Sequence, residues 1–195
     1  MRIKMTTGLE ALALTAAAVV ALVLPGVAAS AGPAATPIGA RSTAASCAIS
    51  WGSLPKEDQV PAGAAILTNV RSGRHDCYDR LVLDGSSFIR AGYVDRVRAD
   101  GSGAVVPLRG GARLQIITTS AGGAVTAEPP YQPGNPRELV DLTGYRTFRQ
   151  AAWAGDFEGQ STIGLGVRAR LPFRVFVLTA ADGSSRAVID VAHQW

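Results

Sequence analysis

The chain has 195 residues, of which 47% are hydrophobic and 17% are charged, and its formal net charge at pH 7 is +4. This length fits one domain that can bury a core, and the absence of a basic run with interleaved aromatic residues excludes the usual nucleic-acid-binding modules. Solvated strand faces explain most of the scattered arginines, although a mildly basic protein also suits anionic wall polymers.

The first 29 residues have the pattern of an export signal. Met1–Lys4 is short and positively charged, and an apolar run, Ala11–Leu24, follows it. Small residues then offer cleavage sites after Ala29 or after Ala31. The run is shorter than the roughly 18 to 20 residues that a membrane helix needs. We therefore expect a secreted protein with a cleaved signal peptide over residues 1–29 and no membrane span in the mature form.

Residues 30–46 are rich in Ala, Gly, Pro, Ser and Thr and are expected to form a flexible linker before a folded domain at residues 47–195. Cys47 and Cys77 are the only cysteines, and an even number in an exported protein predicts a disulfide bond. Closing this loop is worth roughly 3 to 4 kcal/mol in the chain-entropy model. A redox or metal-binding pair is the alternative, but CxxC spacing and clustered histidines are missing.

Period-two alternation and turn residues predict an all-β domain. We expect strands at residues 64–71, 77–84, 88–98, 105–108, 113–119, 145–150, 161–168, 172–178 and from 185 onward. Turns are expected at residues 55–61, 72–76, 84–87, 100–103, 109–111 and 182–184, with a corner at Gly155-Asp156. Residues 121–137 form a proline-rich surface loop that could present Tyr131 to a partner. Eight or nine strands without a convincing helix favour a β-sandwich or a jelly-roll-like barrel.

Two of these strands repeat the pattern Arg-x-Val-x-Asp. The matching residues are Arg80, Val82 and Asp84 in one strand and Arg186, Val188 and Asp190 in the other. The alternate residues Leu81, Leu83, Ala187, Ile189 and Val191 are expected to face the core. If the strands pair antiparallel, Arg80 faces Asp190, and Asp84 faces Arg186. Parallel pairing in the same register would oppose like charges, and placement in different sheets is the other alternative.

Glycine patterns give no sign of a cofactor. The spacing Gly164-x-Gly166 lacks the third glycine and the following helix of a dinucleotide-binding turn, so we expect close backbone approach or a bulge. The turn at residues 100–103 lacks the alternating oxygen ligands of a calcium loop. We therefore expect neither a cofactor nor a metal ion.

The sequence offers weak candidates for acid-base chemistry. They are His75 beside Asp76, His193 near Asp190, and Asp156 with Glu158, which would share one strand face. A catalytic triad can assemble from distant residues, but neither a Gly-x-Ser-x-Gly elbow nor a zinc-binding His-Glu-x-x-His helix is present. We therefore expect no enzymatic activity, and solvated polar residues are the simpler interpretation.

Several segments together resemble the AMIN-like domain of secreted proteins from high-GC Gram-positive bacteria. They are Trp51-Gly52-Ser53, His75 to Val82, Gly92-Tyr93-Val94, Gly155 to Gly159, Pro172 to Phe176 and Arg186 to Val191. The resemblance covers roughly residues 47–195. It implies a non-catalytic β-sandwich with two similar halves, of the kind often attached to wall amidases and secretion pores, which targets a protein to peptidoglycan or the envelope. No amidase or pore domain follows in this chain, so a separate partner would be needed.

The sequence thus predicts a non-enzymatic module of the cell envelope that associates with peptidoglycan or another wall polymer. Its candidate ligand contacts are Arg80, Tyr145, Trp153 and Arg174. One alternative is a domain that docks onto another secreted protein through the proline-rich loop. The second is a wall hydrolase that uses His75 or His193.

Overall fold

The computed structural model describes residues 47–61, 66–119 and 131–195, so the expected signal peptide and linker lie outside the described residues. Nine strands form in the described part. They are β1 (Lys56–Gln59), β2 (Asn69–Arg74), β3 (Tyr78–Asp84), β4 (Phe88–Val94), β5 (Ala112–Thr119), β6 (Phe148–Phe157), β7 (Gln160–Val167), β8 (Phe173–Thr179) and β9 (Ser185–Ala192).

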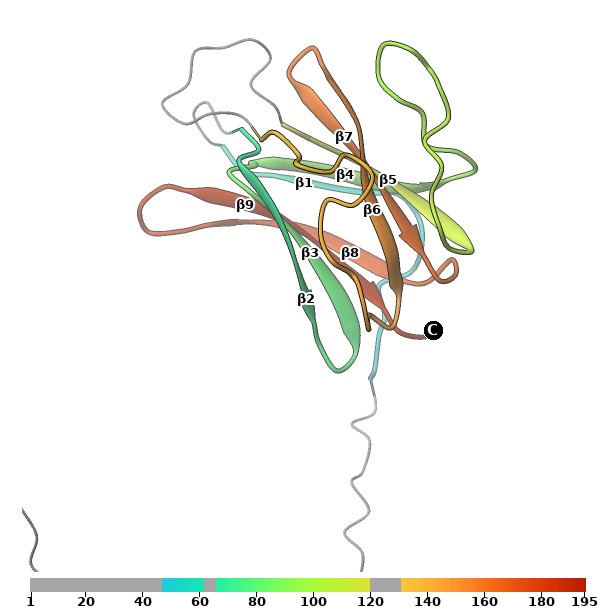
Figure 1. Ribbon diagram of the computed structural model, residues 1–195. Helices are drawn as coiled ribbons and strands as arrows, with labels where there is room; N and C mark the ends of the chain where they lie inside the picture. Colours follow the sequence, from blue (N-terminus) through green and yellow to red (C-terminus); the bar gives the residue numbers. More distant parts are fainter. Residues whose placement is uncertain (1–46, 62–65, 120–130) are drawn as a thin grey trace, which may run out of the picture. The chain divides into compact units, whose positions relative to one another are not determined.

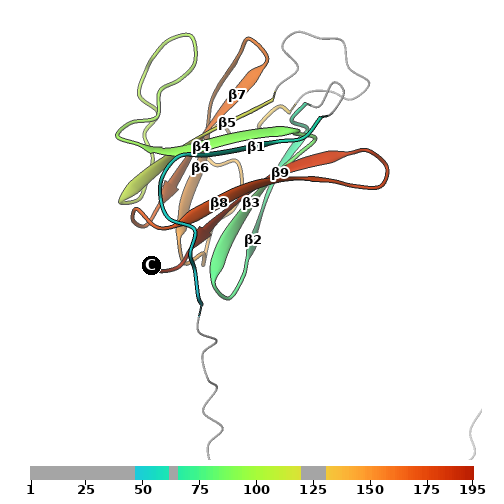
Figure 2. The ribbon, with the colours of Figure 1, turned by 180° about the vertical axis from the view of Figure 1, so that it is seen from behind.

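The strands form two antiparallel sheets that pack as a sandwich. One sheet has the order β1-β4-β5-β7-β6 and the other the order β2-β3-β9-β8, and both views show them as two layers (Figures 1 and 2). The described residues contain no helix, and hence none long and apolar enough to cross a membrane. The predicted all-β sandwich is therefore confirmed.

The core lies between the two sheets and follows the predicted alternation. Leu81, Leu83, Ala187, Ile189 and Val191 are fully buried, as expected for the inward face of β3 and β9. They pack against inward residues of the other sheet, including Leu114, Ile116, Ile163 and Leu165. At roughly 1.5 to 3 kcal/mol for each large aliphatic side chain removed from water, this layer is the main source of stability.

The two Arg-x-Val-x-Asp strands are neighbours. β3 pairs antiparallel with β9 in the predicted register, so that Arg80 lies opposite Asp190, and Asp84 lies opposite Arg186. The first opposition forms an ion pair, with 2.7 Å between Arg80 Nε and Asp190 Oδ1. Asp84 and Arg186 do not form an ion pair, because Asp84 binds Arg71 of β2 instead, with 2.8 Å between Arg71 Nε and Asp84 Oδ2.

Some expected boundaries were wrong, and the polar edges of the sheets explain why. Residues 55–61 were expected to be a turn, but β1 pairs there with β4 as a charged edge strand, whose sequence lacks the apolar alternation of a central strand. β2 continues to Arg74 through the expected 72–76 loop. β6 passes the expected corner at Gly155 as a bulge with φ of +134°, and the chain turns only at Glu158.

The glycines of β7 allow close approach, as expected. A Cβ atom on Gly166 would lie 2.0 Å from the carbonyl oxygen of Arg109, and one on Gly164 would lie 2.8 Å from Leu108 Cδ1. The segment before β5 therefore packs directly on β7. By contrast, Tyr131 does not extend outward, because its N–H donates to the carbonyl of Leu67 and its ring packs against the core.

Candidate functional site

The outer face of the β2-β3-β9-β8 sheet carries a cluster of two arginines around one buried aspartate. Strand register places Arg80, Asp190 and Arg174 side by side on β3, β9 and β8. Arg80 donates from Nε to Asp190 Oδ1 at 2.7 Å and from Nη2 to Oδ2 at 2.9 Å. Arg174 donates from Nε to Oδ2 at 2.8 Å. Both carboxylate oxygens of Asp190 are therefore occupied.

Three aromatic rings surround these guanidinium groups. Arg174 lies 4.4 Å from the ring centroid of Trp51 and 5.2 Å from that of Phe176. Arg80 lies 5.3 Å from the centroid of Tyr78, whose ring makes an edge contact with Trp51. These distances are within the range of cation-π attraction. The rings hold the planar guanidinium groups in fixed orientations at the surface.

The cluster keeps a positive charge at a solvent-exposed surface. Asp190 is fully buried, whereas the side chains of Arg80 and Arg174 are 24% and 39% exposed. The hydrogen bond to Asp190 raises the pKa of Arg80 above its ordinary value, so this arginine stays charged at any physiological pH. One carboxylate thus orients two cations, and the terminal nitrogens of Arg174 make no hydrogen bond to the described residues.

The neighbouring rows extend this surface along the same sheet. The next outward residues are Arg71, Val82, Val188 and Phe176, followed by Asn69, Asp84, Arg186 and Leu178. Across the three rows the face carries four arginines, namely Arg71, Arg80, Arg174 and Arg186, against two aspartates. We call this surface, together with Trp51 and Tyr78, the arginine-aromatic face.

The other two predicted contacts lie elsewhere. Tyr145 stacks on Phe148 and donates its hydroxyl hydrogen to Ser72 Oγ at 2.8 Å. Trp153 packs against the main core beside Tyr131. Both are therefore partly buried packing residues. The structure brings together Arg80 and Arg174 and separates them from Tyr145 and Trp153.

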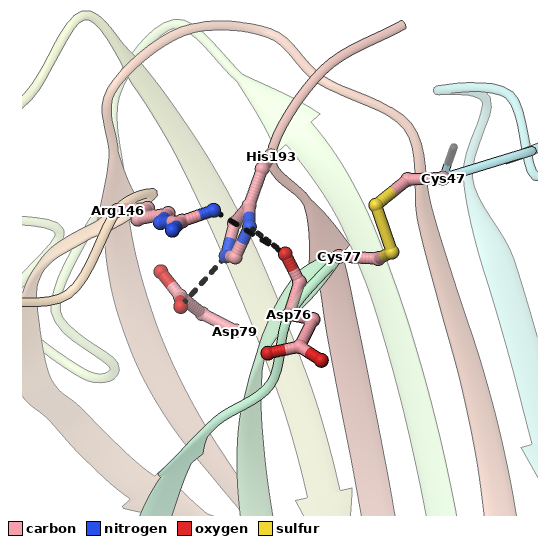
Figure 3. Close-up of a disulfide and its surroundings, with 6 residues drawn as sticks. All are labelled: Cys47, Asp76, Cys77, Asp79, Arg146 and His193. Carbon is pink, nitrogen blue, oxygen red and sulfur yellow. Dashed lines mark hydrogen bonds and ion pairs between the residues drawn. A yellow bond between two sulfur atoms is a disulfide. The ribbon is translucent and has the colours of Figure 1, made fainter. Parts of the chain in front are cut away.

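A second polar centre lies near the disulfide, at one end of the sandwich (Figure 3). The predicted Cys47–Cys77 bond is present, with 5.4 Å between the Cα atoms. His193 lies next to it, with Nε2 at 3.0 Å from Asp79 Oδ1 and Nδ1 at 3.1 Å from the carbonyl oxygen of Asp76. Asp79 Oδ2 accepts from the N–H groups of Thr147 and Phe148 at 2.5 and 3.1 Å.

This centre joins His193, which follows β9, to Asp79 on β3. The expected pairing of His193 with Asp190 was wrong. The two residues are three positions apart, and residues an odd number apart on an extended chain point to opposite faces. His193 therefore lies with Asp79, and both of its ring nitrogens face acceptors. Both ring nitrogens of His193 are therefore engaged by neighbouring groups of the protein.

The remaining candidates for acid-base chemistry do not converge either. His75 stacks on Tyr78, with 4.4 Å between the ring centroids. Asp156 lies on β6, but Glu158 occupies the following turn at φ of +50°, so the two carboxylates do not share a strand face as expected. Among the described residues, no group of three or more His, Cys, Asp or Glu side chains could hold a metal ion.

Comparison with known proteins assigns the fold to a family. The family model of the AMIN-like domain matches residues 65–193, which include both sheets except β1. The chain belongs to the AMIN-like domain family. No curated protein and no solved structure matches it. Membership of this family, together with the disulfide, suggests an extracellular or envelope-related module.

Sequence reasoning found only part of the arginine-aromatic face of this AMIN-like domain. It found Arg80 and Arg174 but missed Trp51, Tyr78 and Phe176 as their neighbours. For Trp51 and Tyr78 one signal was available. The predicted disulfide joins Cys47, four residues before Trp51, to Cys77, the residue before Tyr78. For Phe176 the signal was its position two residues after Arg174, which puts both side chains on the same face of the strand.

Proposed function

We propose that this AMIN-like domain is a secreted, non-enzymatic module that binds peptidoglycan, or another anionic wall polymer, through the arginine-aromatic face. The observation that carries the proposal is the arrangement of Arg80 and Arg174 around buried Asp190, with Trp51 beside them. Holding two cations in place before a ligand arrives lowers the entropy cost of binding.

The chemistry of the face matches the chemistry of such a polymer. Guanidinium groups pair with carboxylates in a planar, bidentate geometry, and peptidoglycan stems carry free carboxylates. Aromatic rings offer flat apolar surfaces for the C–H faces of sugars, and Trp51 lies at the margin of the cluster, 4.4 Å from Arg174. The face is also extended, because three rows of outward residues cross four strands, and this suits a polymer better than a small molecule.

A non-catalytic role is part of the proposal. Asp190 has all its oxygens engaged by arginines, and His193 has both ring nitrogens engaged by Asp79 and Asp76. General acid-base catalysis needs a group that can exchange a proton with a substrate. These contacts favour binding over bond cleavage at both polar centres.

The proposal is tested by co-sedimentation of the mature protein with purified wall sacculi. Arg174→Gln leaves Asp190 bound to Arg80, and Trp51→Ala leaves both arginines in place. Each is expected to weaken sacculus binding by about tenfold, as for an arginine or tryptophan that contributes strongly to an interface. Arg90→Gln, which removes one exposed charge from β4, is the matched control and is expected to bind like the wild-type protein.

The alternatives predict other results. If Arg174→Gln and Arg90→Gln weaken sacculus binding equally, and if salt abolishes the binding of the wild-type protein, the attraction is a non-specific effect of net charge. If sacculus binding is instead lost when residues 121–130, the part of the proline-rich loop that includes Pro129 and Pro130, are replaced by a glycine-serine linker, the domain docks through that loop. Release of soluble wall fragments that stops with His193→Gln would show a hydrolase.

A further inference from the structure

We propose that the hollow beside the disulfide, at the open end of the sandwich, is a separate binding site for a phosphoryl group. This site goes beyond the arginine-aromatic face, because it lies where the β2-β3 turn meets the segment before β6. Its volume is about 370 Å³, and its lining includes Arg74, His75, Arg146 and His193. Water occupies roughly 30 Å³ per molecule in the liquid, so the hollow has room for a phosphoryl group and the carbon chain or sugar attached to it.

The hollow contains two guanidinium groups that have no carboxylate partner among the described residues. Arg74 lies over the ring of Tyr145, at 5.9 Å from its centroid, and a Cβ atom on Gly144 would lie 3.2 Å from its Nη1 atom. Arg74 therefore reaches across to the segment that carries Arg146. The only hydrogen bond made by the Arg146 side chain to the described residues is a long one, 3.4 Å, to the carbonyl of Asp76.

The acidic residues of the lining do not neutralise these arginines. Asp79 is fully buried and bound to His193 and to the backbone N–H groups of Thr147 and Phe148. Asp76 turns its carbonyl oxygen toward Arg146 and His193, while its carboxylate points the other way (Figure 3). The floor of the hollow is thus internally hydrogen-bonded, and its walls present two guanidinium groups without a carboxylate partner among the described residues.

The number and placement of donors favour a tetrahedral oxyanion over a planar carboxylate. Arg74 comes from the end of β2, His75 from the following turn, and Arg146 from the facing segment. Donors from these two facing segments can supply the three terminal oxygens of a phosphoryl group, whereas a carboxylate offers only two oxygens in one plane. Guanidinium pairs with phosphate are short and strong because both partners are charged.

A larger hollow serves as an internal comparison. It has a volume of about 560 Å³ and is lined by Arg109, Glu138 and Arg149 among others. There Arg109 forms an ion pair with Glu138, at 2.5 Å from its Nη1 atom. Arg149 donates to the carbonyls of Tyr145, Arg146 and Phe148. Its arginines are therefore occupied, and we expect no anion to bind in this larger hollow.

The test is a titration of the mature protein with inorganic phosphate, followed by ¹H–¹⁵N NMR at constant ionic strength. Saturable shifts are expected for the backbone N–H groups of residues 74–76 and 144–147. The double variant Arg74→Gln/Arg146→Gln is expected to lose at least about tenfold in affinity, since each charge-assisted hydrogen bond contributes strongly. Arg90→Gln/Arg96→Gln removes the same charge from exposed positions outside the hollow and is expected to leave the affinity unchanged.

Three further measurements make the result decisive. Acetate that binds as tightly as phosphate would overturn the preference for phosphoryl groups, and equal losses in both double variants would overturn the site. A glycerol phosphate oligomer that binds more tightly than inorganic phosphate identifies a polymer as the source, while equal binding identifies free phosphate. The single variant Arg146→Gln, which leaves Arg74 over the ring of Tyr145, serves if the double variant unfolds.

Discussion

Two aspartates of the paired β3 and β9 strands are fully buried, and they serve opposite purposes. Asp190 faces outward and binds two arginine side chains, whose other donors reach the surface. Asp79 faces the opposite way and binds two backbone N–H groups and the ring of His193. The partners of a buried carboxylate thus decide its role. Side-chain cations held by a carboxylate keep donors at the surface, whereas backbone donors fix the course of the chain.

The position of each aspartate follows from strand parity. Asp190 lies opposite Arg80 and Arg174 in register, so the sheet itself assembles the outer cluster. Asp79 lies opposite Val191, whose side chain is in the core. A carboxylate on that side can stay charged only with dedicated donors. The start of β6 supplies them, and this ties the second sheet to the first.

The largest expected effect on stability is that of replacing Asp79. Replacing it with alanine leaves the His193 ring and two backbone N–H groups without their partner. Because each buried polar group left unsatisfied costs about 1 to 3 kcal/mol, we expect a loss of about 3 to 5 kcal/mol in the free energy of unfolding. Urea denaturation measures this loss. Sacculus binding of the remaining folded protein is expected to be unchanged. A loss below about 1 kcal/mol would mean that Asp79 is not a structural anchor.

The disulfide joins the two centres, and its removal sharpens the comparison. Cys77 accepts a hydrogen bond from His193 N through its carbonyl, and Cys47 holds the segment that carries Trp51. We expect Cys47→Ala/Cys77→Ala to lose up to about 3 to 4 kcal/mol of stability. Sacculus affinity is also expected to fall, because Trp51 is released from Arg174. Unchanged affinity in the folded variant would show that Trp51 needs no covalent anchor.

Asp190→Ala is expected to cost less stability than Asp79→Ala. Its partners are partly exposed and can turn to water, so we expect about 1 to 3 kcal/mol in the free energy of unfolding. The larger effect is on function, because the two guanidinium groups lose their fixed positions. Sacculus binding measured at high salt, where non-specific attraction is screened, is expected to fall. Stronger destabilisation than Asp79→Ala would reverse the assignment of the two roles.

The hydroxyl group of Tyr93 is also bound by backbone groups, as Asp79 is, but it is neutral. Its hydroxyl donates to the carbonyl of Leu171 and accepts from the N–H of the same residue. Burial raises the pKa of Tyr93 above its ordinary value. The folded state therefore keeps this proton longer than the unfolded state, so the stabilisation is complete below about pH 10 and is lost as the pH rises further.

Replacing Tyr93 with phenylalanine is expected to have the smallest effect on stability among these variants. The variant is expected to lose about 1 to 2 kcal/mol at neutral pH, because the backbone groups of Leu171 lose their partner. Its stability is also expected to fall less steeply above pH 10 than that of the wild-type protein, which urea denaturation at several pH values can measure. An identical slope would assign the alkaline loss to other groups, such as Tyr131, whose pKa burial also raises.

Period-two alternation carried most of what the sequence could predict about the fold. It identified the inward residues of β3 and β9. It also gave the register that joins Arg80 to Asp190 if the two strands pair antiparallel, and the structure shows that they do. It failed for β1, whose Lys-Glu-Asp-Gln sequence is polar throughout. Such an edge strand is defined by its pairing with β4, and local residues do not reveal that pairing.

The candidate site was predicted less completely than the fold. Arg80 and Arg174 were chosen as surface cations on strands, and the register brought them together. The contribution of Trp51 depends on a segment without regular secondary structure, which the disulfide and a hydrogen bond from Phe173 N to the carbonyl of Gly52 hold beside β8. Contacts of this kind come from tertiary packing, and alternation along one strand gives no information about them.

The three tryptophans of the chain allow the most direct test of the account. Trp51 lies in the arginine-aromatic face, Trp153 packs on the core, and Trp195 donates its indole N–H to the carbonyl of Arg170. In ¹H–¹⁵N spectra of the mature protein titrated with soluble peptidoglycan fragments, we expect the indole N–H signal of Trp51 to shift and the other two to stay in place. Shifts at Trp153 or Trp195 without a shift at Trp51 would contradict the proposed binding face.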